Sequence, residues 1–541
     1  MAMKPLRIKA TPPAGTADRE DPLLKEMNRR VDRARADRQR HQSRIADCYK
    51  YAMPWRHKFY QTPASFNTVE LDEIFDELSA VVLEDFSADM LNTFTPRKNN
   101  WLSEQPVEYL DTAAQRMIAE PLKRRVTVIF SEMARSNLYQ ALQEAYMDLG
   151  PGTMAMLIMD IDATKPIHCE AIPATELLIT RGSYGYVDGV FRDRSYRREE
   201  IELLWRDADL QALSNAQGNK ETEFEVIDGC WRDWSDRGNE TYRYAVQTQG
   251  KIIYEKTWYG AGACPFIVAR WSRDSTTAWG VGPTYRVLPA IKSRNHVRYL
   301  ALKNYDRHVD PVTSYEDDGV INVDNGVEPG KWLPRLQGSQ APEVIESKAR
   351  FDVQVFEMDE LAQTIRRAHY QDRPEQIGKT PPSATQWADE AAERARRMGT
   401  PATNLVEEWQ YGIYRRFAYL LDQRGVLPKV TLDQRVVALQ PISPLLRAQE
   451  QEEVIRLDRF TELIAARFGP QIAMVVVDII KYAHRLAQLL GVDPDLLRDE
   501  NDIADAIQKL LPVLQHFAGT AGAAGQPVAP PALGLVGGQT T

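Results

Sequence analysis

The sequence predicts an α+β protein that is mainly helical, on three observations. Stretches near both ends of the chain carry apolar residues at three- and four-residue steps, which is the period of amphipathic helices. The central stretch changes to short aromatic and β-branched runs separated by Gly, Asp-Gly or Asn turns, which indicates strands. At 541 residues the chain is long for one hydrophobic core, so two to four structural units are expected.

The first part of the chain is predicted to be helical. Residues 1–20 are polar and contain prolines, so we expect a flexible N-terminus. Helices are expected at about Asp21–Tyr51, at Asp72–Thr95, where apolar residues form one buried stripe, and at Thr112–Leu149. Pro121 is expected to kink the third helix near its start. The sequence Gly150-Pro151-Gly152 then ends the helical pattern.

The strands are expected between Thr153 and Arg270. Eight runs fit, and their hairpin-like spacing predicts a largely antiparallel arrangement. One helix, Arg197–Leu213, interrupts them. The runs are TMAMLIMDI, IHCEAIPA, LLIT, YGYVDGVFRDRSY, FEVIDGCW, TYRYAVQT, KIIYEKTW and CPFIVARW.

The second half returns to helix. Thr284–His308 predicts a helix about 25 residues and roughly 37 Å long. Residues 309–349 are rich in Gly, Pro and Asp, and 350–372 resume as helix. The remaining expectations are a Pro-rich loop at 373–384, a helix over Thr385–Arg424 kinked at Gly399-Thr400-Pro401, short strands near Val430 and Val436, helices over 443–517, and a disordered tail at 518–541.

Composition and charge exclude several classes of protein. Apolar residues are 43% and charged residues 26%, which is ordinary for a globular protein. A net charge of -9 argues against gripping nucleic acid by neutralising phosphates, although a channel that lets DNA slide is compatible with it. The same charge also simply favours solubility. No run of eighteen apolar residues and no signal-like stretch occurs, so neither a membrane partner nor export is expected.

Residues that could carry chemistry are scattered. Cys48, Cys169, Cys230 and Cys264 are widely spaced without a CxxC pair, and are expected to be reduced thiols. The eight histidines lack metal-ligand spacing, and no HExxH or GxSxG motif is present. We therefore expect no metal, no cofactor and no catalytic residue.

Two glycine motifs superficially suggest nucleotide binding. Gly378-Lys379-Thr380 resembles the end of a phosphate-binding loop, but the glycine needed five positions earlier is Arg373. The sequence WGVGP has Gly280 and Gly282 but no third glycine, so a Gly-Pro start of a helix explains it. A nucleotide-driven DNA motor enzyme and a monomeric helical scaffold or adaptor remain the alternative functions.

One segment carries a family resemblance. The pattern comprises Trp271, Arg273, Gly280, Gly282, Pro283, Leu288, Pro289, Ile291, Lys292 and Pro311. It resembles the portal (head-to-tail connector) family of short-tailed, T7-like bacteriophages, although members more often have Asp at Ala290 and a second proline at Asp310. The runs ISPLLRAQEQEEVIRLDRF and LLGVDPDLLRDENDIADAI resemble the family's C-terminal half, and the order of elements agrees from about residue 20 to 515.

The resemblance implies a portal fold assembled as a ring, usually a dodecamer, around a channel for double-stranded DNA. It implies a wing (21–283 and 385–442), a stem (284–308 and 350–372), a clip (309–349), a channel loop (373–384) and a crown (443–517). The ring would be made in the host cytoplasm and would occupy the portal vertex of the virion, serving packaging and ejection. Implied partners are terminase, tail adaptor and nozzle proteins, and the major capsid and scaffolding proteins.

The resemblance also gives candidate residues. Arg373 and Lys379 would contact DNA phosphates without reading sequence, although a plain surface loop explains them equally well. Solvated charged surfaces are likewise the alternative for the stem and the clip. The stem candidates, expected to exchange opposite charges between subunits, are Arg294, Arg298, Lys303 and Arg307 against Asp359 and Glu360; the clip candidates for partner docking are Glu316, Asp317, Asp318, Asp324 and Glu328.

Overall fold

The structure is a computed structural model, and it confirms a mixed helix-and-sheet protein. It describes residues 21–56, 73–107, 112–160, 167–210, 223–235, 238, 240–309, 313–314, 343–344, 351–372, 397–428, 437–441 and several residues between 454 and 486. The chain divides into two units, Met1–Leu445 and Leu446–Thr541. No helix in the described ranges is long and apolar enough to cross a membrane.

The described part of residues 21–148 contains four α-helices. They are α1 (Pro22–Ala52), α2 (Leu78–Phe94), α3 (Thr112–Arg135) and α4 (Leu138–Asp148). The carboxylate of Asp21 accepts a hydrogen bond from the Leu23 amide at 3.0 Å and caps α1, and a proline follows at the first helical position. The start of α1 thus lies where the sequence predicts it.

Two helix boundaries differ from the prediction, and at each one an asparagine side chain binds the backbone of a segment distant in sequence. The helix expected over Thr112–Leu149 is interrupted after Arg135, where Asn137 bonds both the amide and the carbonyl of Cys169, at 2.9 and 2.7 Å. Pro121 lies inside α3 without ending it. The helix expected from Asp72 begins only at Leu78, because Asn295 Oδ1 accepts from the amides preceding it.

All eight predicted strands are present, and they form antiparallel sheets. A five-stranded sheet has the order β4-β5-β6-β7-β8, and a three-stranded sheet has the order β3-β2-β9. The strands are β2 (Thr153–Met159), β3 (His168–Ile172), β4 (Leu177–Arg181), β5 (Val187–Arg197), β6 (Glu223–Asp233), β7 (Thr241–Thr248), β8 (Lys251–Tyr259) and β9 (Phe266–Arg270).

The helix predicted over Arg197–Leu213 is much shorter than expected. It is α5 (Arg198–Leu204). Trp205 ends it: the ring lies 5.6 Å from that of Tyr196, and its indole N–H donates to the Tyr244 hydroxyl at 3.0 Å. The chain therefore leaves the helix to bury this side chain against the sheet.

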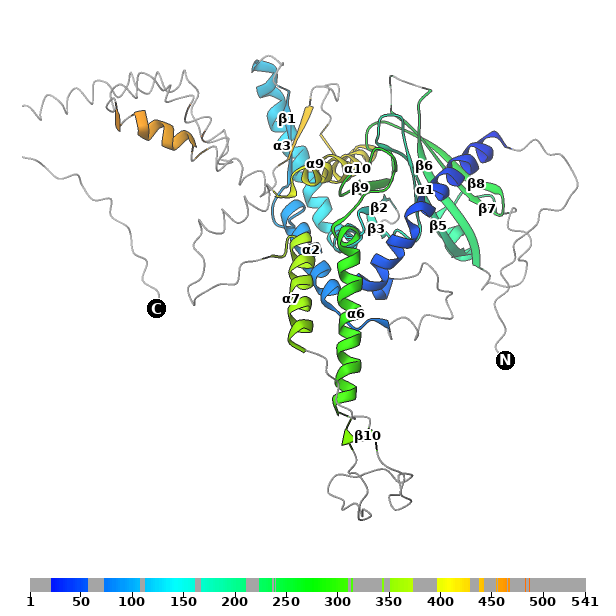
Figure 1. The fold of residues 1–541 in the computed structure, drawn as a ribbon. Helices are drawn as coiled ribbons and strands as arrows, with labels where there is room; N and C mark the ends of the chain where they lie inside the picture. The colour runs from blue at the N-terminus through cyan, green and yellow to red at the C-terminus, as the bar shows by residue number, and fades with distance from the viewer. Residues whose placement is uncertain are drawn as a thin grey trace, which may run out of the picture. The chain divides into compact units, whose positions relative to one another are not determined.

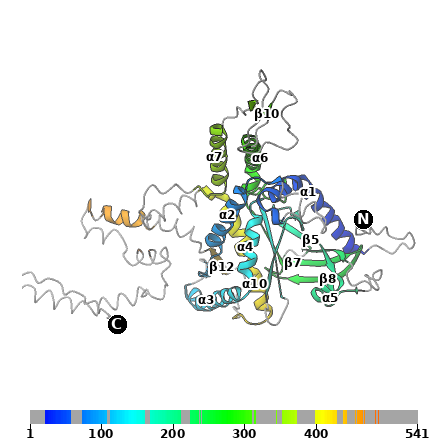
Figure 2. The same ribbon diagram turned by 90° about the horizontal axis from the view of Figure 1, so that it is seen from below.

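Helix α1 covers one face of the five-stranded sheet. Its buried residues Met27, Val31 and Ala34 pack on Phe191 and Trp231 of the sheet. In Figure 2 this helix and the strands β5, β7 and β8 lie on the same side of the first unit. A larger core joins the end of α1, the helices α2 to α5 and residues between 398 and 427 to both sheets.

An antiparallel helix pair projects from these elements. It consists of α6 (Pro283–Val309) and α7 (Phe351–Ala368), which lie side by side in Figures 1 and 2 and contact each other. At 1.5 Å per residue they are about 40 and 27 Å long. Their far ends lead to β10 (Thr313–Ser314) and β11 (Glu343–Val344), which pair antiparallel. Helix α6 agrees with the prediction within one residue at each end, whereas α7 begins within one residue of the predicted start and ends four residues before residue 372.

The first unit ends in a broken helix and a small sheet. Residues 385–396 of the predicted long helix lie outside the described residues. Gly399, at φ 47°, interrupts the helical backbone at the predicted position, and α9 (Thr400–Asn404), a π-helical stretch (Leu405–Gln410) and α10 (Tyr411–Gln423) follow. The strand expected near Val436 is β12 (Val437–Pro441), whose partner is the unpredicted β1 (Leu102–Pro106). Val430 lies outside the described residues.

The second unit is described only in part. Residues 456–464 and a few others between 454 and 486 are helical, in agreement with the prediction there. The Tyr482 hydroxyl donates to Asp458 at 2.6 Å. The remainder of 443–517, the tail 518–541 and residues 1–20 lie outside the described residues.

Candidate functional site at the base of the helix pair

The glycines of the family motif lie against a second glycine segment. The amide of Gly282 donates to the Pro151 carbonyl at 3.1 Å, and the amide of Trp271 donates to Gly152 at 2.9 Å. A Cβ on either Gly280 or Gly282 would approach backbone atoms of residues 149–152 closer than 3.0 Å. Only glycine permits this contact, which joins the end of α4 to the start of α6.

The start of α6 is tied to the end of α7. Pro283 is the first residue of α6, and the next residue, Thr284, donates its amide to the Gly150 carbonyl at 3.0 Å. The Thr284 hydroxyl lies 2.8 Å from Nε2 of His369, and Nδ1 of His369 lies 2.9 Å from the Ile365 carbonyl. Because a carbonyl only accepts, Nδ1 carries the proton and Nε2 accepts from Thr284.

Burial keeps this histidine neutral. His369 has no exposed surface, and desolvation lowers its pKa to about 4. The hydrogen bond to Ile365 opposes this shift in pKa but is the smaller effect. The base of the helix pair therefore contains an uncharged imidazole that makes two hydrogen bonds.

The Trp271 side chain is buried between several elements of the fold. Its side chain is 1% exposed, and its ring centroid lies 5.5 Å from that of Phe86 and 5.8 Å from that of Tyr370. Its carbonyl accepts from Nδ2 of Asn404 at 3.2 Å. The residue therefore joins α2, the end of α7 and α9.

The arginines around Trp271 form an ion-pair cluster. Arg270, the last residue of β9, donates its backbone amide to Glu408 at 3.0 Å and a guanidinium N–H at 2.6 Å. Arg273 of the motif reaches Glu408 at 3.0 Å and Glu407 at 3.2 Å. Since Arg270 and Glu408 are both buried, their pairing fixes β9 to the π-helical stretch.

The remaining described motif residues anchor α6. Leu288 and Ile291 are buried, and Ile291 packs with Val82 and Ile365. Pro289 lies within α6, and Lys292 pairs with Asp47 of α1 at 2.6 Å. These contacts hold the first three turns of α6 against the neighbouring helices.

The structure corrects one of the proposed charge partners. Arg294 is mostly buried and pairs with Asp76 at 2.8 Å, and it also donates to the Met358 carbonyl, so its partners lie in its own chain. Arg298, Lys303, Arg307, Asp359 and Glu360 are exposed, and the described part of the chain supplies none of them with an ion pair.

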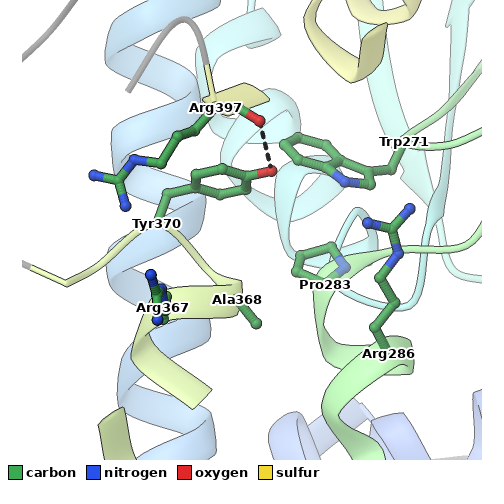
Figure 3. A pocket seen from close by; sticks show the side chains of 7 residues that line it. All are labelled: Trp271, Pro283, Arg286, Arg367, Ala368, Tyr370 and Arg397. Atoms are coloured by element: carbon green, nitrogen blue, oxygen red, sulfur yellow. Dashed lines mark hydrogen bonds between the residues drawn. The ribbon is translucent and has the colours of Figure 1, made fainter. Parts of the chain in front are cut away.

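A pocket of about 310 Å³ opens beside Trp271. Figure 3 shows Arg286 next to Trp271 and Pro283, while Arg367 and Arg397 lie on the other side of Tyr370, with the Arg397 guanidinium directed away from Trp271. The Tyr370 hydroxyl donates to the Arg397 carbonyl at 3.5 Å. These arginines come from α6, α7 and the segment before α9, and their common position along one pocket was not predicted.

Several candidate residues lie outside the described residues. They are the channel candidates Arg373 and Lys379, the motif residue Pro311, and the clip acids Glu316, Asp317, Asp318, Asp324 and Glu328. Within the described ranges no three His, Cys, Asp or Glu side chains form a group that could hold a metal ion.

Sequence reasoning missed three buried polar residues here: Arg270, Glu408 and His369. Arg270 ends the strongly apolar run FIVAR, and a charge in such a run signals a buried partner. The sequence pattern does not identify that partner, because Glu408 is 138 positions away. His369 carries no comparable signal, since a single histidine after a helix is commonplace.

The motif segment has a structural role. Through glycine contacts and buried polar pairs it attaches the helices α6 and α7 to the neighbouring helices and sheets. Residues 24–497 match the bacteriophage head to tail connecting protein family, so the chain belongs to this family of structural proteins.

Proteins of low sequence identity are similar to most of this chain. The probable portal protein of Bordetella phage BPP-1 is 22% identical over 503 residues, which are 87% of this chain and 88% of that protein. A chain in the structure of the neck of an empty gene transfer agent particle has 11% sequence identity and a TM-score of 0.38, over 71% of this chain and 86% of that chain. The virion of a native gene transfer agent particle is 11% identical with a TM-score of 0.33, over 67% and 92%.

Proposed function

We propose that the chain is a portal subunit that assembles as a ring, usually of twelve copies, at one vertex of the capsid. Double-stranded DNA passes through the ring during packaging and ejection. Membership of the head to tail connecting family supports this function. The structural observation that supports assembly as a ring is the surface of the α6–α7 pair, which exposes many apolar side chains to solvent in the single subunit.

Apolar side chains on the pair lack cover within the described chain. Exposed fractions reach 67% for Val309 and 71% for Phe356. The exposed apolar residues are Tyr299, Leu300, Leu302, Tyr305, Val309, Val355 and Phe356. Such a concentration on two adjacent helices indicates a protein contact, and a second copy of the same pair satisfies it.

Charges on the pair support the same arrangement. Arg298, Lys303 and Arg307 of α6 carry positive charge, and Asp359 and Glu360 of α7 carry negative charge. In a ring, α6 of one copy would face α7 of the next, and each exposed pair would contribute about 0.2–1 kcal/mol. Lys292 and Arg294, bound to acids of their own chain, serve the subunit instead.

In this proposal the α6–α7 pair is the stem, residues 309–349 form the clip, and the helices and sheets of 21–283 with 385–442 form the wing. Residues 443–517 form the crown. The acids Glu316, Asp317, Asp318, Asp324 and Glu328 give the clip a surface for terminase and then for tail adaptor and nozzle proteins. Arg373 and Lys379 of the loop 373–384 touch DNA phosphates, and the ring binds the capsid and scaffolding proteins.

The oligomeric state tests the proposal directly. Light scattering and negative-stain images of the purified chain should give rings with a central hole. Charge reversal of Arg298 and Arg307 to Glu should abolish the rings, and reversal of Asp359 and Glu360 to Lys in the same chain should restore them. Arg135→Glu, an exposed reversal on α3, is the matched control. A monomer under all conditions, including with scaffolding protein, would favour the adaptor function.

The channel residues need a separate test. Arg373→Glu with Lys379→Glu should leave rings intact and lower DNA packaging or retention. Unchanged packaging would remove these residues from the channel. ATP hydrolysis by the purified chain that is lost in Lys379→Ala would instead favour the motor enzyme.

A further inference from the structure

Two of the four cysteines lie side by side, although β7 and β8 separate them in the chain. Cys230 lies in β6, the central strand of the five-stranded sheet, and its thiol donates a hydrogen bond to Cys264. Cys264 lies in the segment between β8 and β9 and packs against the same core as Cys230. In its neutral form the Cys264 thiol donates to the Phe266 carbonyl at 3.3 Å. A disulfide requires two thiols in contact, and this pair meets that requirement.

A buried cation lies next to the two thiols. Arg416 of α10 is 3% exposed, and its guanidinium donates to the carbonyls of Ile158 and Ala263, at 2.9 and 2.7 Å. Ala263 directly precedes Cys264, so the positive charge is held against the backbone of this cysteine. In the part of the chain that the structure describes, no carboxylate forms an ion pair with Arg416. A buried charge without a counter-ion is costly, and a thiolate is the anion that this site can supply.

The two thiols differ in acidity in the direction that this arrangement requires. The hydrogen bond from Cys230 lowers the pKa of Cys264, and the charge of Arg416 acts in the same direction. Burial raises the pKa of Cys230. Burial also lowers the pKa of Arg416 to about 10, and the charges of the two cysteines oppose that shift. Cys264 is therefore the member of the pair that ionises, and Cys230 is the member that stays protonated.

The other two cysteines provide an internal comparison. Cys48 and Cys169 are buried, and burial raises the pKa of both thiols, that of Cys169 to about 12. Cys264, by contrast, is partly exposed, so a small oxidant can reach its sulfur. The chain thus contains one accessible thiol with a neighbouring thiol, and two buried thiols that we expect to be inert.

We propose that Cys230 and Cys264 form a disulfide in an oxidising medium, with a low-molecular-weight disulfide such as oxidised glutathione as the oxidant. The Cys264 thiolate attacks one sulfur of glutathione disulfide, which forms a mixed disulfide and releases one glutathione thiolate. Cys230 then loses its proton to that thiolate, attacks the Cys264 sulfur and releases the second glutathione. Two protein thiols are oxidised, and one glutathione disulfide is reduced to two glutathione molecules.

The new bond would connect the two sheets of the first unit. Cys230 belongs to the five-stranded sheet, and the segment that contains Cys264 leads into β9 of the three-stranded sheet. In a reducing medium both residues stay thiols, as the sequence predicts for all four cysteines. The proposal concerns one subunit and does not depend on the ring.

The test is oxidation of the purified full chain with oxidised glutathione, followed by thiol counting under denaturing conditions. The count should fall from four to two, and digestion without reductant should yield peptides linked through Cys230 and Cys264. Cys264→Ser should abolish the loss of thiols, whereas Cys230→Ser should stop at a mixed disulfide between Cys264 and glutathione. Cys48→Ser and Cys169→Ser are the matched controls, and both variants should still form the bond.

Two further measurements test the chemistry and the effect of the bond. Iodoacetamide should alkylate Cys264 of the reduced native chain at least about 10-fold faster than Cys48 or Cys169. Oxidation should raise the thermal unfolding midpoint of the wild type by about 3–8 °C, reversibly with dithiothreitol, and should not do so in Cys230→Ser. A thiol count that stays at four, a disulfide that contains Cys48 or Cys169, or a link between two chains would each overturn the proposal.

Discussion

The hydroxyl of Thr284 donates to Nε2 of His369 across 2.8 Å, and this bond links the second residue of α6 to the first residue beyond α7. Both side chains are fully buried. The two helices are therefore joined at their base by a contact that depends on an uncharged imidazole, which makes the base sensitive to pH.

We expect acid to weaken this base through His369. Its pKa falls to about 4 on folding, whereas in the unfolded chain it stays near 6.5, so the unfolded state binds the proton first as pH falls. The contribution of neutral His369 to the free energy of unfolding is fully present above about pH 6.5. It falls by about 3 kcal/mol as the pH is lowered to about 4. Urea unfolding of wild type and His369→Gln should show a stability difference that shrinks from pH 7 to pH 4. A constant difference would contradict the prediction.

The buried acid Asp148 should respond in the opposite direction. It accepts from the Tyr49 hydroxyl and from Arg56 at 3.1 Å, yet burial raises its pKa to about 6. Between about pH 4 and 6 the folded state therefore holds a proton that the unfolded state has lost, and stability falls as pH rises, by about 3 kcal/mol. Relative to Asp148→Asn, wild type should lose stability from pH 4 to pH 6 in the same unfolding measurement. Loss on acidification instead would refute this.

Glu408 and its neighbour Glu407 offer a matched comparison. Glu408→Ala leaves the buried guanidinium of Arg270 without its carboxylate, and should lower the free energy of unfolding by about 3–5 kcal/mol. Glu407→Ala removes only a half-exposed partner of Arg273 and should cost about 1 kcal/mol or less. Chemical denaturation of both variants checks this prediction. Equal losses in the free energy of unfolding would show that the buried ion pair stabilises the fold no more than the exposed one.

The glycine contact gives the sharpest steric prediction. Gly282→Ala places a Cβ against backbone that cannot move aside, and should cost about 3 kcal/mol or more or prevent folding. Gly425→Ala is the control: its Cβ meets open space, and only the positive φ of 66° costs about 1–2 kcal/mol. Thermal unfolding and soluble yield distinguish the two. A Gly282→Ala chain as stable as the control would mean that the two segments are not in contact.

The elements with strong local patterns were predictable from the sequence. Helix α6 and the strands follow from the Gly-Pro start and from alternating apolar runs, which need no knowledge of neighbours. Strand β1, by contrast, is the polar run LSEQP, and it exists as a strand because β12 pairs with it. The break after Arg135 likewise depends on Asn137 meeting Cys169.

The site was predictable only as a set of motif residues. Gly280, Gly282 and Pro283 were identified by resemblance, but their contact with residues 150–152 requires the folded chain. The pocket arginines carry no signal at all, since each is one of many charged residues on a helix or loop. Proximity in space is the information that a linear pattern lacks.

The glycine contact also constrains how this chain can be recombined with a relative. The two segments, 150–152 and 280–282, lie far apart in sequence and yet share one set of backbone contacts. A chimera with a crossover anywhere between them inherits half of the contact from each parent. Functional crossovers should therefore fall before residue 150 or after residue 282, and the intervening sheets should be exchanged as one block.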